Sequence, residues 1–127
     1  EEPIRFILQE WLPAFRGYFG WNGIELKGEE ASRSELDYVE IIDATYGLII
    51  ADSSPSIRHV TVSVTDPINF LYTIGFAIIG RSSPRLIDIT ASGLYAGVLI
   101  ADNASPWITH SNIVDNLLVG IYVSAEI

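Results

Sequence analysis

The sequence predicts an all-β solenoid, in which the short strands of successive coils stack on one another in parallel. Two repeated phrases predict this fold. A Ser-Pro-x-aliphatic phrase occurs three times. A glycine followed by alternating aliphatic residues occurs five times, at Gly23, Gly47, Gly75, Gly97 and Gly120. The intervals of 24, 28, 22 and 23 residues are typical of solenoids, whose units bury their apolar faces only against neighbouring units.

The two phrases place the expected strands in chain order. One set follows the glycines, at residues 24–26, 48–50, 76–78, 98–100 and 121–123. A second set follows Ser34, Pro55, Pro84 and Pro106. Two, five and seven residues after each of these four positions, eleven of the twelve residues are apolar. Residues 4–6 also have the composition of a strand. Each coil therefore contains at least two short strands separated by turn-forming residues.

Other repeat folds fit the sequence less well. A leucine-rich repeat needs a Leu-x-x-Leu-x-Leu-x-x-Asn frame, which no coil carries. A run of hairpins needs Asn-Gly or Asp-Gly turns between strands, and the one such pair, Asn22-Gly23, begins a coil instead. No stretch has a long helical period. We therefore expect a right-handed parallel β-helix of about five coils.

The phrases also carry a family resemblance. The runs concerned are 3–6, 21–24, 34–41 and 44–48, which read PIRF, WNGI, SELDYVEI and ATYGL. Their cadence resembles that of right-handed parallel β-helix repeat proteins, the pectate-lyase-like superfamily in its broad sense. The resemblance implies a secreted or cell-surface protein and specifies the fold more than the activity, since such coils host lyases, hydrolases, binding modules and architectural stalks.

The length and the two ends predict the domain organisation. At 127 residues the chain is a single domain, residues 1–127. Both ends fall within the repeat, because residues 4–6 resemble a strand and Ile127 follows the fifth glycine phrase directly. We expect either a piece of a longer chain or a protomer whose ends are covered by another copy.

Composition excludes several classes of function. The formal net charge of −9 has the wrong sign for a nucleic-acid groove. Without cysteine there are no disulfides, thiolate metal sites or cysteine nucleophiles. The longest apolar run, residues 68–79, is shorter than the about 20 residues that span a bilayer, so we expect no transmembrane segment.

The outer face of the first sheet gives the main functional hypothesis. If the residues one and three places after each glycine point inward, the residue two places after it points outward, because strand side chains alternate. Apart from Glu25, these outward residues are Ile49, Ala77, Leu99 and Tyr122. A contiguous apolar patch usually marks an interaction surface, so we expect these four residues to form one.

The same face argues against catalysis. Carbohydrate-active β-helices place clustered carboxylates on an outward-facing sheet, and this face offers only Glu25. We expect no catalytic residues. The acidic stretch 29–43 leaves calcium binding open as an alternative to a solvated surface. His59 and His110 occupy matching positions two coils apart but lack a third ligand, so we expect surface histidines and no metal site.

The aromatic residues offer one candidate for ligand binding. Trp107 directly follows Pro106 and is the best placed of the three tryptophans to stack on a sugar ring, although a packing role is the alternative. The sequence therefore predicts a non-catalytic structural or interaction module of an extracellular or cell-surface protein. Its expected partners are further copies, through the solenoid ends or the apolar first sheet. A carbohydrate-binding or carbohydrate-processing β-helix, with a polysaccharide partner, is the alternative. A trimeric spike or adhesin stalk is a third hypothesis.

Overall fold

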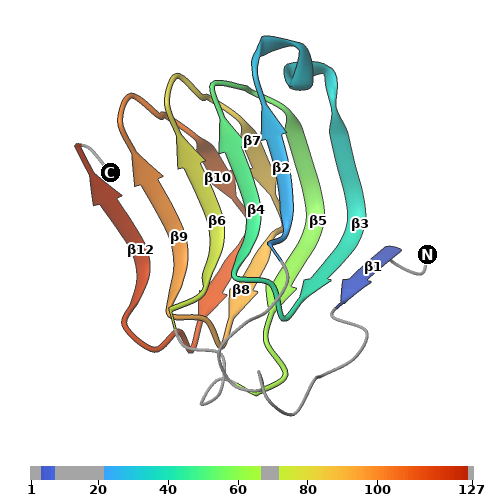
Figure 1. Cartoon of the computed structure of the whole chain (residues 1–127), viewed down its shortest axis with the longest axis vertical. Coiled ribbons are helices and arrows are strands. Elements are labelled where there is room, and N and C mark those ends of the chain that lie inside the picture. The colour runs from blue at the N-terminus through green and yellow to red at the C-terminus, as the bar shows by residue number, and fades with distance from the viewer. Residues whose placement is uncertain (1–3, 8–21, 67–71, 126–127) are drawn as a thin grey trace.

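A computed structural model describes residues 4–7, 22–66 and 72–125 of the chain (Figure 1). It is an all-β parallel solenoid of about four turns, rather than the five predicted. The difference arises at the end of the described chain. The fifth glycine phrase forms a strand there, but no strand of the opposite sheet follows it among the described residues. Pro3 and Trp21, which carry part of the family resemblance, lie outside the described residues.

The glycine phrases form one continuous sheet, which we call the glycine sheet. Its strands lie in the order β12-β9-β6-β4-β2 and pair in parallel. Their bounds are β2 (Ile24–Lys27), β4 (Tyr46–Ala51), β6 (Ile74–Ile79), β9 (Ala96–Ala101) and β12 (Val119–Ser124). Residues at equal distances from each glycine are paired, so the register predicted from the repeat is confirmed.

The second phrase forms the opposite sheet, which we call the proline sheet. It contains β1 (Ile4–Ile7), β3 (Glu35–Ile42), β5 (Ser56–Ser63), β7 (Arg85–Ile87), β8 (Thr90–Ser92), β10 (Trp107–Thr109) and β11 (Asn112–Val114). All of its pairings are parallel. The register aligns Leu36, Ile57, Leu86 and Ile108, as the spacing predicts. One short 3-10 helix, η2 (Glu29–Arg33), joins β2 to β3.

A column of left-handed residues bends the proline sheet in every coil. Its members are Tyr38, His59, Asp88 and His110, with φ between 52° and 57°. A residue in this conformation interrupts the alternation of side chains. The residues that point inward therefore lie two, five and seven places after Ser34, Pro55, Pro84 and Pro106. The bend falls between the first and second of these inward residues, which are three places apart and not two. The long strands β3 and β5 run through the bend, whereas later coils divide there into β7 and β8, and β10 and β11.

The core consists of aliphatic columns between the two sheets. Leu48, Phe76 and Val98 stack in the glycine sheet and are fully buried. Ile57 and Leu86 face them from the proline sheet and are also fully buried. Burying a side chain of this size stabilises a fold by about 1.5–3 kcal/mol relative to leaving it exposed. Each coil therefore depends on its two neighbours, and the outer faces of the sheets are left for function.

The glycine at the start of each strand is required by close approach of the next coil. A Cβ on Gly47 would lie 2.6 Å from the carbonyl oxygen of Gly75, and one on Gly75 would lie 2.5 Å from that of Gly97. A Cβ on Gly97 would lie 2.7 Å from the carbonyl oxygen of Gly120. These distances are shorter than any side-chain carbon tolerates. The glycine is therefore required because one coil stacks closely on the next.

Candidate functional site

The predicted interaction residues lie in one outward column of the glycine sheet. Ile49 pairs with Ala77, Ala77 with Leu99, and Leu99 with Tyr122. The four side chains differ in exposure. Ala77 is only 4% exposed, Ile49 and Leu99 are half-buried, and Tyr122 is 54% exposed. Ala77 has only a methyl group, and its neighbours in the column are the larger Ile49 and Leu99. Tyr122 is the most exposed of the four, so the most accessible part of the predicted face lies at Tyr122 and its neighbour Leu99.

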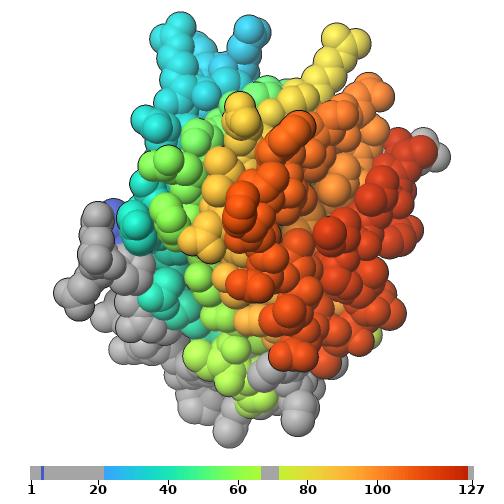
Figure 2. All heavy atoms as spheres, turned by 180° about the vertical axis from the view of Figure 1, so that it is seen from behind, coloured from blue at the N-terminus to red at the C-terminus, as the bar shows by residue number. Residues whose placement is uncertain are grey.

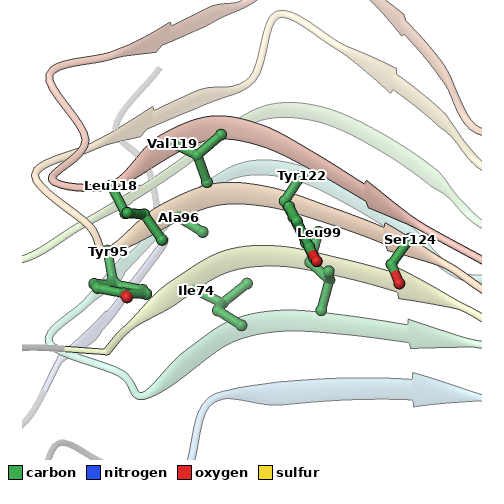
Figure 3. Close-up of a pocket in the computed structure, with 8 residues that line it drawn as sticks. All are labelled: Ile74, Tyr95, Ala96, Leu99, Leu118, Val119, Tyr122 and Ser124. Carbon is green, nitrogen blue, oxygen red and sulfur yellow. The ribbon is translucent and has the colours of Figure 1, made fainter. Parts of the chain in front are cut away.

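An apolar groove of about 450 Å³ lies at this accessible part (Figure 3). Leu99 and Tyr122 line it together with Ile74, Tyr95, Ala96, Leu118, Val119 and Ser124. They come from β6, β9 and β12 and from the turns that lead into β9 and β12. Seven of the eight side chains are apolar or aromatic, so the groove suits an apolar surface better than a charged ligand.

Sequence reasoning missed the side of the groove formed by the turns. The ring of Tyr95 packs against that of Tyr72, with centroids 5.0 Å apart and planes tilted by 54°. Leu118 is exposed and directly precedes β12. The apolar run Leu117-Leu118-Val119 before Gly120 is the sequence signal that could have predicted this side, because polar and turn-forming residues dominate exposed turns in general.

The last coil exposes side chains that belong to the core columns. Ile121 continues the column of Leu48, Phe76 and Val98, yet it is 45% exposed, whereas Val98 is fully buried. Val123 continues the column of Ile50 and Ile78 and is 68% exposed. Both side chains lie on β12, the last described strand of the glycine sheet.

A polar cluster occupies the outer face of the proline sheet, at its bend. The carboxylate of Asp37 lies 2.7 Å from Nδ1 of His59 and 3.1 Å from a guanidinium nitrogen of Arg58. On its other side, Nε2 of His59 lies 3.4 Å from the carboxylate of Asp88. The ring of His59 stacks on that of Tyr38, with centroids 4.3 Å apart. The left-handed column thus aligns one side chain from each of three coils.

Electrostatics within this cluster favour the ionised form of Asp37. The hydrogen bond with His59 lowers the pKa of the Asp37 carboxyl, and Arg58 adds a smaller effect in the same direction. The cluster borders a hollow of about 230 Å³, which Glu40, Thr61 and Thr90 also line. No group of three or more histidine and acidic side chains placed to hold a metal ion occurs among the described residues.

The structure places the two predicted histidines as expected but does not bring them together. His59 and His110 both occupy the left-handed column, with Asp88 between them. Asp37, Tyr38 and Asp88 were not predicted as partners of His59. Only the offset of the histidines from the Ser-Pro phrase was visible in the sequence, since contacts between coils depend on backbone torsions that no local pattern encodes.

Trp107 lies on the outer face of the proline sheet, at the start of β10. Its side chain is 60% exposed, and the guanidinium carbon of Arg85, its neighbour in β7, lies 5.8 Å from the ring centroid. Figure 2 shows the molecule from this side, with the coils as successive bands of colour. The predicted stacking residue is therefore on the surface, with a cation over part of its ring.

Comparison with known proteins identifies no family for this chain. No protein-family model, curated protein or solved structure matches this chain. The parallel solenoid itself is established by the pairing of the strands, and the pectate-lyase-like resemblance stays a prediction. Within 4–7, 22–66 and 72–125, no helix has both the length and the apolar character needed to span a membrane.

Proposed function

We propose that this chain is a non-catalytic structural and interaction module that associates with further copies of itself, in an extracellular or cell-surface setting. One observation carries the proposal: Leu99 and Tyr122 of the outward column line an apolar groove on the outer face of the glycine sheet. Leu118, which is 63% exposed, and Tyr95 extend this apolar surface into the turns beside the sheet. Together they form an apolar region of the kind that marks an interface.

Sedimentation of the purified chain between about 1 and 200 µM tests the proposal. We expect oligomers that grow with concentration, and Tyr122→Asp should weaken association by at least about tenfold, or about 1.4 kcal/mol. The reason is that a charge would replace an exposed aromatic side chain within the apolar groove. Trp107→Asp is the matched control, because it introduces the same charge at a similarly exposed aromatic residue on the opposite sheet. A chain that stays monomeric throughout this range contradicts the proposal.

A second candidate function, carbohydrate binding, is favoured by the surroundings of Trp107. An exposed indole with a guanidinium beside it provides an apolar platform and hydrogen-bond donors, which sugar rings use together. If the chain binds a glycan on an array, Trp107→Ala should abolish that binding while leaving self-association unchanged. Binding that survives this substitution would remove the tryptophan from the candidate site.

A further inference from the structure

We propose that one edge of the solenoid binds a small molecule that carries a carboxylate at one end and an ammonium group at the other, as free lysine does. The inference goes beyond the proposed function, since it uses neither the apolar groove nor Trp107. A polar hollow of about 490 Å³ lies at this edge. Its lining consists of Glu29, Ser32, Asp52, Ser53, Ser54 and Arg81.

Three turns of unequal length form the hollow. Figure 1 shows the turns that follow β2, β4 and β6 beside one another at one edge of the solenoid. The middle turn, residues 52–55, is the shortest, because its neighbours cover residues 28–34 and 80–84. The short turn therefore forms the floor, and the longer turns form a wall on each side. Since described coils lie on both sides of the floor, the hollow is not an end of the solenoid.

The two walls carry opposite charges. Glu29 belongs to η2 on one wall and Arg81 to the turn on the other, and both side chains are exposed. Neither has an ion pair among the residues that the structure describes. The two turns are two strand spacings apart, about 10 Å, so the walls suit a ligand with its charges at the ends of an extended chain. A guanidinium binds a carboxylate through paired hydrogen bonds, and a carboxylate binds an ammonium group.

The floor supplies side chains that are already fixed by contacts between coils. The carboxylate of Asp52 accepts a hydrogen bond from the backbone N–H of Arg81 at 3.0 Å and keeps further lone pairs for a ligand. The hydroxyl of Ser54 accepts a hydrogen bond from Ser83 N–H at 2.8 Å, which leaves its own proton to donate. Ser54 N–H in turn donates to the hydroxyl of Ser32 at 2.7 Å. Groups held in this way lose less conformational entropy when a ligand binds.

The charges of the lining select a basic amino acid. Two carboxylates and one guanidinium give the lining a formal charge of −1. Lysine carries the reverse set, two ammonium groups and one carboxylate. In the proposed mode its carboxylate lies at Arg81, its side-chain ammonium group at Glu29 and its α-ammonium group at Asp52. A diamine would leave the guanidinium without a partner, and an anion would meet two carboxylates.

Titration of the isotope-labelled chain with L-lysine, followed by NMR, tests the site. A ligand of this size in an open hollow should bind with a Kd of about 1 mM. The backbone N–H groups of Arg81 and Ser83 are the reporters, because they donate to Asp52 and Ser54. Norleucine, which lacks the side-chain ammonium group, and cadaverine, which lacks the carboxylate, should each bind about fivefold more weakly.

Two results of this titration would overturn the site. One is the absence of any shift at the two reporter N–H groups up to about 50 mM lysine, a concentration well above the expected Kd. The other is an equal response to glycerol, a neutral polyol, because the serine hydroxyls alone would then account for binding. Neither result bears on self-association, which is measured separately by sedimentation.

Substitutions on the walls test the roles of the charges. Arg81→Gln and Glu29→Gln should each weaken lysine binding about fivefold, and Arg81→Gln should also remove the preference for lysine over cadaverine. The matched controls are Arg85→Gln and Glu35→Gln, which make the same charge changes at exposed residues outside the hollow and should leave the Kd unchanged. Lysine binding that survives both wall substitutions would contradict the proposal. Urea unfolding verifies that each variant folds like the parent.

Discussion

At the level of single residues, the left-handed column decides which polar side chains meet. Tyr38, His59 and Asp88 project from the bend in successive coils because each adopts a positive φ. Neighbouring coils are one strand spacing apart, about 4.8 Å, so side chains of adjacent members come into contact. The stack of His59 on Tyr38 and the contact of His59 with the Asp88 carboxylate follow directly.

The lowered pKa of Asp37 predicts a change of stability in acid. A carboxyl whose pKa is lower in the folded than in the unfolded chain stabilises the fold above its ordinary pKa of 3.8, and this contribution is lost as pH falls through the folded value. Asp37→Asn should therefore lower the urea midpoint at pH 6, and the difference from the parent should shrink below about pH 4. Urea unfolding of the parent and the variant at both pH values measures this.

Glu35→Gln is the control for that experiment. Glu35 is an exposed acidic residue on the same strand, and it has no ion pair among the residues that the structure describes. Its substitution should leave the pH dependence of the midpoint as in the parent. A constant difference between Asp37→Asn and the parent from pH 6 to pH 3 would show that the contacts of the Asp37 carboxylate do not depend on its charge.

At the level of strands, coil-to-coil contact explains both repeated phrases. The glycine allows a carbonyl oxygen of the next coil to approach, and the alternating aliphatic residues after it enter the core columns. Hydrogen bonds between side chains and backbone reinforce the turns. The hydroxyl of Ser54 accepts one from Ser83 N–H at 2.8 Å, and that of Ser32 accepts one from Ser54 N–H at 2.7 Å. The serine of the Ser-Pro phrase therefore joins neighbouring coils.

Gly75→Ala should destabilise the fold, unlike the same substitution at Gly120. Its Cβ would lie 2.5 Å from a backbone carbonyl oxygen and 2.8 Å from a side-chain carbon of Leu94, so both strands must shift. Overpacking of this kind costs about 1–3 kcal/mol. Urea unfolding of monomeric samples should show the loss for Gly75→Ala and almost none for Gly120→Ala. Equal losses would mean that the glycines are retained for flexibility and not for close approach.

The strands and their register could be predicted because the repeat aligns equivalent residues of every coil. Leu36, Ile57, Leu86 and Ile108 were assigned to one column from spacing alone, and they are paired in the structure. The number of turns was overestimated, because a complete turn needs a strand in each sheet. Counting glycine phrases counts the strands of one sheet only. The gap of three residues at the bend was visible, but its cause, a left-handed residue, was not.

The candidate site could be predicted only in part, for a related reason. Alternation along a strand identified Leu99 and Tyr122 as outward residues, and both line the groove. It also identified Ala77, which is buried. Alternation gives the direction in which a side chain points, but not whether larger neighbouring side chains cover it. Tyr95 and Leu118 lie in turns, where no period applies. The groove therefore required the three-dimensional structure.

At the level of the whole molecule, charge opposes the association that the apolar surfaces favour. The net charge of −9 acts between any two copies. Self-association therefore brings like charges together, and its strength depends on how far they are screened by salt.

Raising the NaCl concentration from about 0.1 to about 1 M should strengthen association, because the Debye length falls from about 10 Å to about 3 Å and screens the repulsion between two copies of net charge −9. Asp102→Asn should associate more tightly than the parent at low salt and depend less on salt. It removes one negative charge and keeps a side-chain oxygen that can accept a hydrogen bond at the turn. Sedimentation of both chains at the two salt concentrations measures the effect. Association that weakens with salt would instead require attraction between opposite charges, which none of the eight residues that line the groove supplies.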